Sequence, residues 1–277
     1  MVAQTHKGYY YAPHSYWPIV LCVALLFLTG GFACWINGVG LGKAATALGA
    51  IILAVGMFGW FGRIIVENVS GLYDRQVDDS FRWGMAWFIF SEVMFFGAFF
   101  GALFYSRWIG LSRLDAADLL WPGFTPSWPS LGPGLKGEIA PVDPWGIPAL
   151  NTLLLLSSGA TLTWAHWGLK AQKQGQTLLG LALTIILGAT FLGFQAYEYM
   201  EAAFSIKSGI FGTTFFMLTG FHGMHVTVGT IMLVVAFLRA AKGHFTQENH
   251  FAFEATSWYW HFVDVVWLFL FVFVYWL

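Results

Sequence analysis

The stretch FEATSWYWHFVDVVWLFLFVFVYWL (Phe253–Leu277) is a nearly unbroken apolar run that nonetheless carries Glu254, His261 and Asp264. About 18 or more consecutive apolar residues are enough to span a lipid bilayer. Ionisable groups inside such a run cost roughly 2.5–3.5 kcal/mol each, so they usually face protein, water or a partner rather than lipid. The segment is therefore expected to lie in a membrane and to pack against protein.

The composition of the whole chain supports a membrane protein. Of its 277 residues, 58% are hydrophobic and only 10% are charged, whereas soluble domains have about 25% charged residues. The net charge of −1 gives no electrostatic case for binding nucleic acid. Cys22 and Cys34 lie on one expected helix about 18 Å apart, which is too far for a disulfide.

The apolar runs predict an all-α membrane protein with seven transmembrane helices, forming a single domain over residues 1–277. The expected spans, good to a few residues, are 17–36, 44–66, 81–107, 147–169, 176–203, 209–239 and 252–276. The proline-rich residues 108–146 are expected to form an external loop. Lysine and arginine are more frequent on the side that holds the N-terminus, which predicts a cytoplasmic N-terminus.

Glu92 is the carboxylate expected deepest in the membrane. It lies about ten residues, or about 15 Å, into the third expected span, close to the midplane of a hydrocarbon core about 30 Å thick. It could serve as a proton relay, or it could be a protonated side chain that only packs and hydrogen-bonds. The residues alone leave both interpretations open.

Other polar residues fall inside or at the ends of the spans. His222 and His225 are three apart and share one helix face, as do His261 and Asp264. A metal site would need all of these side chains to converge, so hydrogen bonds between helices are favoured and no metal site is expected. Glu198 is expected near the outer interface, as a buried polar residue.

Five motifs, in this order along the chain, resemble subunit III of cytochrome c oxidase, in the haem–copper oxidase family. They are FIFSEVMFF (Phe88–Phe96), NTLLLLSSGATLTWAHW (Asn151–Trp167), FQAYEY (Phe194–Tyr199), TGFHGMHV (Thr219–Val226) and WYWHFVDVVWLFLF (Trp258–Phe271). The resemblance covers essentially the whole chain from Trp17 to its end.

The resemblance implies a subunit of a proton-pumping oxidase that carries no redox centre of its own. Haem and copper are then expected in partner subunits I and II. This chain would pack directly on subunit I, stabilise it, support its proton uptake and bind structural phospholipid. The resemblance also implies that the first two helices are splayed from a five-helix bundle by a cleft that holds lipid.

The resemblance assigns expected roles to single residues. Glu92 matches the intramembrane carboxylate of the family, and Glu67, His225, Arg239 and Trp258 match positions around bound lipid. Lys242 joins Arg239 at the inner end of the sixth span, where cations also attract anionic lipid headgroups. The segment Gly71–Arg75 departs from the pattern of the family, which puts the detailed lipid contacts in question.

Two alternatives remain. One is subunit III of a quinol oxidase; the other is a stand-alone seven-helix proton transporter or channel that uses Glu92, Asp264 and the histidines. A transporter would favour helices broken near the midplane, yet no proline lies in the interior of any expected span, since Pro18 and Pro148 are each the second residue of theirs. The expected location is a bacterial inner (plasma) membrane rather than a mitochondrial inner membrane, with accessory subunits or other respiratory complexes as further partners.

Overall fold

The structure, a computed structural model, describes residues 14–117, 119–134 and 139–277, and over these residues it contains helices and no strand. The long helices are α1 (Trp17–Ile36), α2 (Gly42–Val69), α3 (Arg75–Phe104), α5 (Ile147–Lys170), α6 (Gln174–Glu201), α7 (Gly209–Ala241) and α8 (Phe251–Leu270). A π-helical turn, Tyr105–Gly110, joins α3 to the short α4 (Leu111–Asp115), and a second one, Phe271–Trp276, follows α8. The all-α fold with seven long helices is as expected.

Six of the seven long helices are long and apolar enough to cross a membrane; α5 is the exception. The α5 helix carries several polar side chains, and two of them, Asn151 and Ser158, are fully buried. Polar side chains that face the protein interior lower the mean hydropathy of a helix, although they do not contact lipid. The span of α5 therefore stays a prediction, whereas the chain as a whole is a membrane protein.

The predicted external loop, residues 108–146, begins too early. Helix continues without a break from Arg75 through Asp115, because no proline interrupts this stretch and Leu111, only 2% exposed, anchors its last turns in the protein. The helix also begins before residue 81, since the Asp74 carboxylate accepts a hydrogen bond from the backbone N–H of Val77 (2.9 Å) and caps its first turn. Glu92 remains near the middle of the lengthened helix.

The chain divides into two compact units, one ending at Phe81 and the other beginning at Arg82. In the first unit, α1 and α2 pack as an antiparallel hairpin in which Gly31, Gly42 and Gly49 are buried. A Cβ atom on Gly49 would collide with the backbone of Leu28 in α1. Small residues thus let the two backbones approach closely, as is common between membrane helices.

We expect Gly49→Ala to loosen the hairpin by about 1–2 kcal/mol, since overpacking costs about 1–3 kcal/mol and the gain in helix propensity returns less than 1 kcal/mol. Gly62→Ala in the same helix is the matched control, because a Cβ atom there meets nothing within 4 Å. The two variants are compared by thermal denaturation in detergent. Equal midpoints for both would contradict the close packing.

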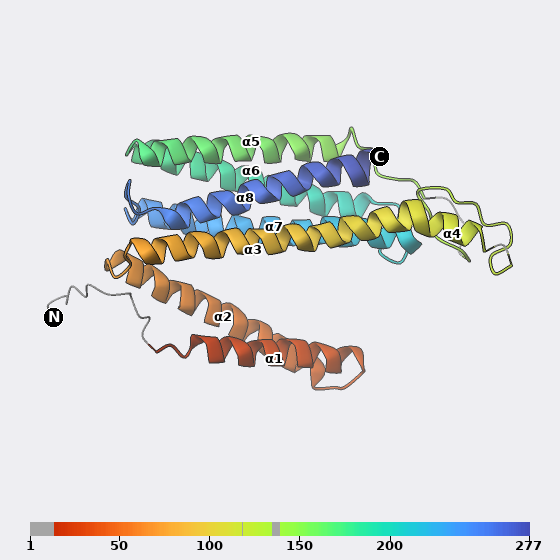
Figure 1. Cartoon of the computed structure of the whole chain (residues 1–277), viewed down its shortest axis with the longest axis horizontal. Helices are drawn as coiled ribbons and strands as arrows, with labels where there is room; N and C mark the ends of the chain where they lie inside the picture. The colour runs from red at the N-terminus through yellow and green to blue at the C-terminus, as the bar shows by residue number, and fades with distance from the viewer. Residues whose placement is uncertain (1–13, 118, 135–138) are drawn as a thin grey trace. The chain divides into compact units, whose positions relative to one another are not determined.

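In the second unit, α5 packs against α6 and α8, and α7 joins α6 to α8 (Figure 1). The centre of this packing is Trp260 of α8, whose side chain is fully buried. Its ring lies against Gly188 of α6 and Gly229 of α7, and its indole Nε1–H donates to Ser158 Oγ of α5 (2.8 Å). One side chain therefore contacts three neighbouring helices.

The α3 helix contacts α7 and α8 through aromatic rings. Phe95 packs edge-on against Phe221 of α7 (ring centroids 5.1 Å apart), and Phe96 packs against Phe262 of α8 (6.1 Å). These contacts hold the middle of α3, and with it Glu92, against the bundle. The predictions of a single domain and of a lipid-holding cleft concern how the two units are arranged together, and they stay predictions.

Candidate functional site

Glu92 of α3 and His225 of α7 form a hydrogen-bonded pair between helices. Glu92 Oε2 lies 2.8 Å from His225 Nε2, and His225 Nδ1 lies 2.6 Å from the backbone carbonyl oxygen of Phe221. Both side chains are largely buried, with exposed fractions of 21% for Glu92 and 7% for His225. The structure therefore brings together two residues that the sequence placed on separate helices.

The hydrogen bonds of this pair fix how many protons it holds. A carbonyl oxygen only accepts, so His225 Nδ1 must carry a hydrogen that it donates to Phe221. The bond between Nε2 and Glu92 then needs one further proton, which resides either on the carboxyl group or on the imidazole. In both cases the pair has no net charge, which suits an apolar environment.

Aromatic rings surround the pair. The His225 ring lies 5.0 Å from the ring of Phe96 and stacks on Tyr259 at 6.4 Å, with an interplanar angle of 18°. Phe95 lies on a further side at 5.9 Å. These rings exclude water from the histidine, whereas Glu92 keeps a partly exposed face.

His222, one turn before His225, faces a different cluster. Its fully buried ring packs against Trp267 (5.2 Å) and Phe191 (5.8 Å). Neither ring nitrogen has a hydrogen-bond partner among the described residues. His222 is thus a packing residue of the bundle core in this structure, and it does not join the pair.

His261 and Asp264 form a separate contact on α8. His261 Nδ1 lies 3.4 Å from Asp264 Oδ2, and the His261 side chain is 42% exposed while that of Asp264 is buried. The metal site considered from sequence would need both dyads to converge. In the described part of the chain they do not appear together in any group of three or more potential metal ligands.

One such group does exist in the described part of the chain, and it consists of His166, His250 and Glu254. Glu254 Oε2 accepts a 2.5 Å hydrogen bond from the Arg82 guanidinium, and Glu254 Oε1 faces both histidines. Sequence reasoning singled out Glu254 but did not predict that it meets two histidines. The four-residue spacing from His250 to Glu254 is the signal that could have pointed to them.

Glu198, expected near the outer interface, is 2% exposed close to the end of α6. Its Oε1 atom accepts hydrogen bonds from Tyr275 (2.6 Å) and from the Gln195 side-chain amide (3.1 Å). These bonds tie the end of α6 to the last turn of the chain.

The predicted lipid-binding residues fall into separate places. Glu67 belongs to the first unit, where it accepts hydrogen bonds from Arg63 (2.8 Å) and Tyr73 (3.0 Å). Arg239, 9% exposed, stacks its guanidinium over Phe245 at 4.6 Å, and Lys242 follows the end of α7. Trp258 is 37% exposed on α8. Their roles toward lipid stay predictions.

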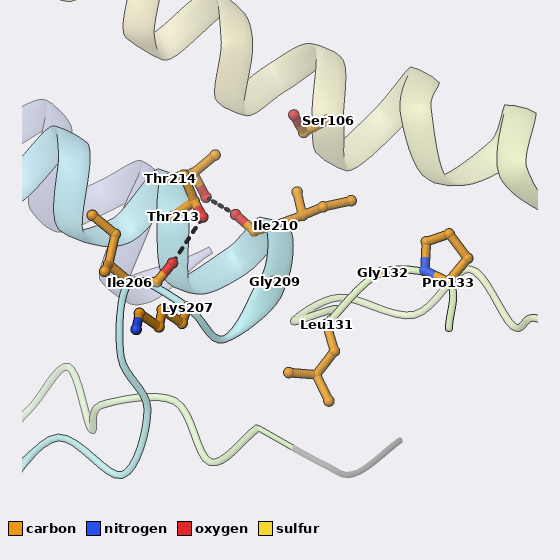
Figure 2. Close-up of a pocket in the computed structure, with 10 residues that line it drawn as sticks. All are labelled: Ser106, Leu131, Gly132, Pro133, Ile206, Lys207, Gly209, Ile210, Thr213 and Thr214. Atoms are coloured by element: carbon orange, nitrogen blue, oxygen red, sulfur yellow. Dashed lines mark hydrogen bonds between the residues drawn. The ribbon is translucent and has the colours of Figure 1, made fainter. Parts of the chain in front are cut away.

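One hollow lies away from all of these residues. It has a volume of about 520 Å³ and is lined by Ser106, by loop residues 131–133 and by the start of α7 (Figure 2). Among the described residues that line it, Lys207 alone is charged. The hydroxyl groups of Thr213 and Thr214 donate hydrogen bonds to nearby backbone carbonyl oxygens. No set of polar groups converges there, so the Glu92–His225 pair remains the candidate site.

Comparison with known proteins gives a consistent result along the whole chain. The family model of cytochrome c oxidase subunit III matches residues 7–277. Cytochrome c oxidase subunit 3 of Formosania lacustris is 44% identical over 277 residues, which is 100% of this chain and 99% of that protein. The corresponding protein of Arabidopsis thaliana is 42% identical over 279 residues, or 100% and 98% of the two chains.

Proposed function

The chain belongs to the cytochrome c oxidase subunit III family and is a subunit of a cytochrome c oxidase complex, and we propose that its part there is non-catalytic. In this proposal the chain stabilises subunit I and supports proton uptake, with the Glu92–His225 pair as the group that holds a proton. The observation that carries the proposal is the 2.8 Å contact between Glu92 Oε2 and His225 Nε2, from which we infer that the pair holds one proton.

A proton held between a carboxyl group and an imidazole can move from one to the other at little electrostatic cost. The Glu92–His225 pair stays neutral whichever partner holds the proton, so proton movement within it leaves no uncompensated charge in the membrane. Glu92 keeps 21% of its side chain exposed, so we propose that the proton is exchanged on its side of the pair, while the aromatic rings shield His225. In this proposal the pair stores one proton and is more than a structural contact.

The redox chemistry is proposed to belong to the partner subunits. Haem and copper would lie in subunits I and II. This chain would contact subunit I directly and would hold no redox centre.

Phospholipid is the proposed ligand, since Arg239 and Lys242 place two cations at the end of α7 where an anionic headgroup would lie. Cytochrome c is the proposed electron donor of the complex, with quinol as the alternative.

The membrane that holds the complex is proposed to be a bacterial inner membrane, with the N-terminus on the cytoplasmic side. Fractionation of the source cells tests this location, because recovery of the chain in mitochondria would contradict it. Accessory subunits or further respiratory complexes are additional proposed partners, and copurification identifies them.

The proposed function is tested by affinity purification of the chain from gently solubilised native membranes, followed by a reduced-minus-oxidised visible spectrum. We expect two larger partners, copper and a haem band in the eluate. Oxidase depleted of this chain should then lose activity sooner during continuous turnover than the intact complex. A colourless eluate that holds only this chain, in a detergent that preserves oxidases, would favour the stand-alone transporter.

A further inference from the structure

Three potential metal-binding atoms converge where α5 ends and α8 begins. Glu254 Oε1 lies 3.2 Å from His250 Nε2 and 3.8 Å from His166 Nε2, and all three atoms lie within 4.8 Å of one another. A zinc ion about 2.0–2.1 Å from each ligand places neighbouring ligand atoms about 3.4 Å apart in a tetrahedron. The observed spacing therefore needs only small movements of the rings to match that geometry.

Each of the two histidines directs one ring nitrogen, Nε2, toward the Glu254 carboxylate. The Nε2 atoms of His166 and His250 are both buried and have no hydrogen-bond partner among the residues that the structure describes, and His250 is only 8% exposed. His250 Nδ1 lies 3.1 Å from the backbone carbonyl oxygen of Thr246, so Nδ1 carries the hydrogen and Nε2 presents its lone pair. This arrangement is the one that orients histidines which bind metals.

His250 Nε2 lies 3.2 Å from Glu254 Oε1. Two lone pairs at that distance repel each other unless a proton or a metal ion lies between them. The approach of His166, which brings a third donor atom to the same point, is not needed to hold a proton between the other two. The third donor therefore favours a metal ion.

Arg82 determines which metals suit the group. Its guanidinium binds Glu254 Oε2, holds the carboxylate in place and cancels its charge, leaving Oε1 to face the histidines. Calcium and magnesium need several oxygen ligands, whereas two imidazoles with one carboxylate suit zinc. We propose that His166, His250 and Glu254 form a zinc site, with water as a fourth ligand.

This site departs from the expectation that the chain binds no metal, and it does not depend on the proposed function of the Glu92–His225 pair. A bound zinc ion would link the last turn of α5 to the first turn of α8. It would bind from the membrane side on which both helix ends lie, since His166 is 19% and Glu254 is 15% exposed at the side chain.

The proposal is tested on the purified, intact oxidase complex by equilibrium dialysis against Zn²⁺, with bound zinc measured per complex. The complex should bind one zinc ion that His166→Asn and His250→Asn lose, with the dissociation constant raised by about tenfold or more. His244→Asn is the matched control, because His244 lies in the same inner loop as His250 but outside the group. Equal zinc uptake by all four complexes would overturn the proposal.

A second measurement needs no variant, so it holds even if a substitution prevents assembly. X-ray absorption at the zinc edge of the dialysed, intact complex reads the ligands of the bound ion directly. We expect two imidazole nitrogens and one carboxylate oxygen at about 2.0–2.1 Å, with a water as the fourth ligand. Bound zinc without imidazole ligands, or no bound zinc, would refute the site.

Discussion

Replacing Trp260 by alanine is expected to destabilise the α5–α8 bundle by about 3–5 kcal/mol, the usual cost of truncating a buried aromatic side chain. The ring is fully buried and contacts Gly188 and Gly229 on two other helices. Within a membrane, close packing rather than exclusion of water holds helices together. The cavity left by the ring therefore removes contacts that lipid cannot replace.

The measurement is the temperature at which the chain dissociates from purified oxidase in detergent, or unfolds, as followed by size-exclusion chromatography. Trp87→Ala is the control, because Trp87 of α3 is 64% exposed and its loss leaves no internal cavity. We expect a clear drop for Trp260→Ala and little change for Trp87→Ala. Equal behaviour of the two variants would show that Trp260 is not the centre of the packing.

A related substitution separates the hydrogen bond from the ring. Ser158→Ala removes the acceptor of the Trp260 indole N–H, which then stays buried without a partner. Such a group costs about 1–3 kcal/mol, so Ser158→Ala should lower the same dissociation temperature by less than Trp260→Ala. A larger effect for Ser158→Ala would mean that its other hydrogen bond, to the Leu155 carbonyl (2.6 Å), dominates.

The helices were largely predictable from sequence, because a long apolar run predicts a membrane helix. The prediction failed where that signal is weak. Residues 108–115 carry charges and fall outside the apolar window, yet Leu111 packs into the protein and the helix continues through them. The polar buried face of α5, with Asn151 and Ser158, weakens the signal in the same way.

The sequence predicts Glu92 near the middle of its helix, and the structure shows it there; its depth in the membrane stays a prediction. The partner of Glu92 could not be predicted. Its pairing with His225 depends on how α3 and α7 are rotated against each other, which no local pattern encodes. The same is true of His166, whose distance along the chain from His250 and Glu254 hides their proximity.

Glu92→Gln and Glu92→Leu are expected to separate the two roles that the sequence left open for Glu92. The glutamine amide keeps an N–H that can donate to His225 Nε2, so the Glu92→Gln chain should assemble into the complex in its normal amount. Leucine leaves His225 Nε2 buried without a partner, which costs about 1–3 kcal/mol. Glu92→Leu should therefore reduce the amount of this chain in the purified complex.

Neither variant keeps the carboxylate, so neither keeps a pair that holds a proton without net charge. If that proton supports uptake by the oxidase, both variants should lose activity sooner during turnover than the unaltered complex, including Glu92→Gln at full assembly. The measurement is the number of turnovers completed before inactivation, normalised to the amount of bound chain. If Glu92→Gln instead matches the unaltered complex and only Glu92→Leu fails, the pair is a structural contact, because hydrogen bonding alone would then account for its effect.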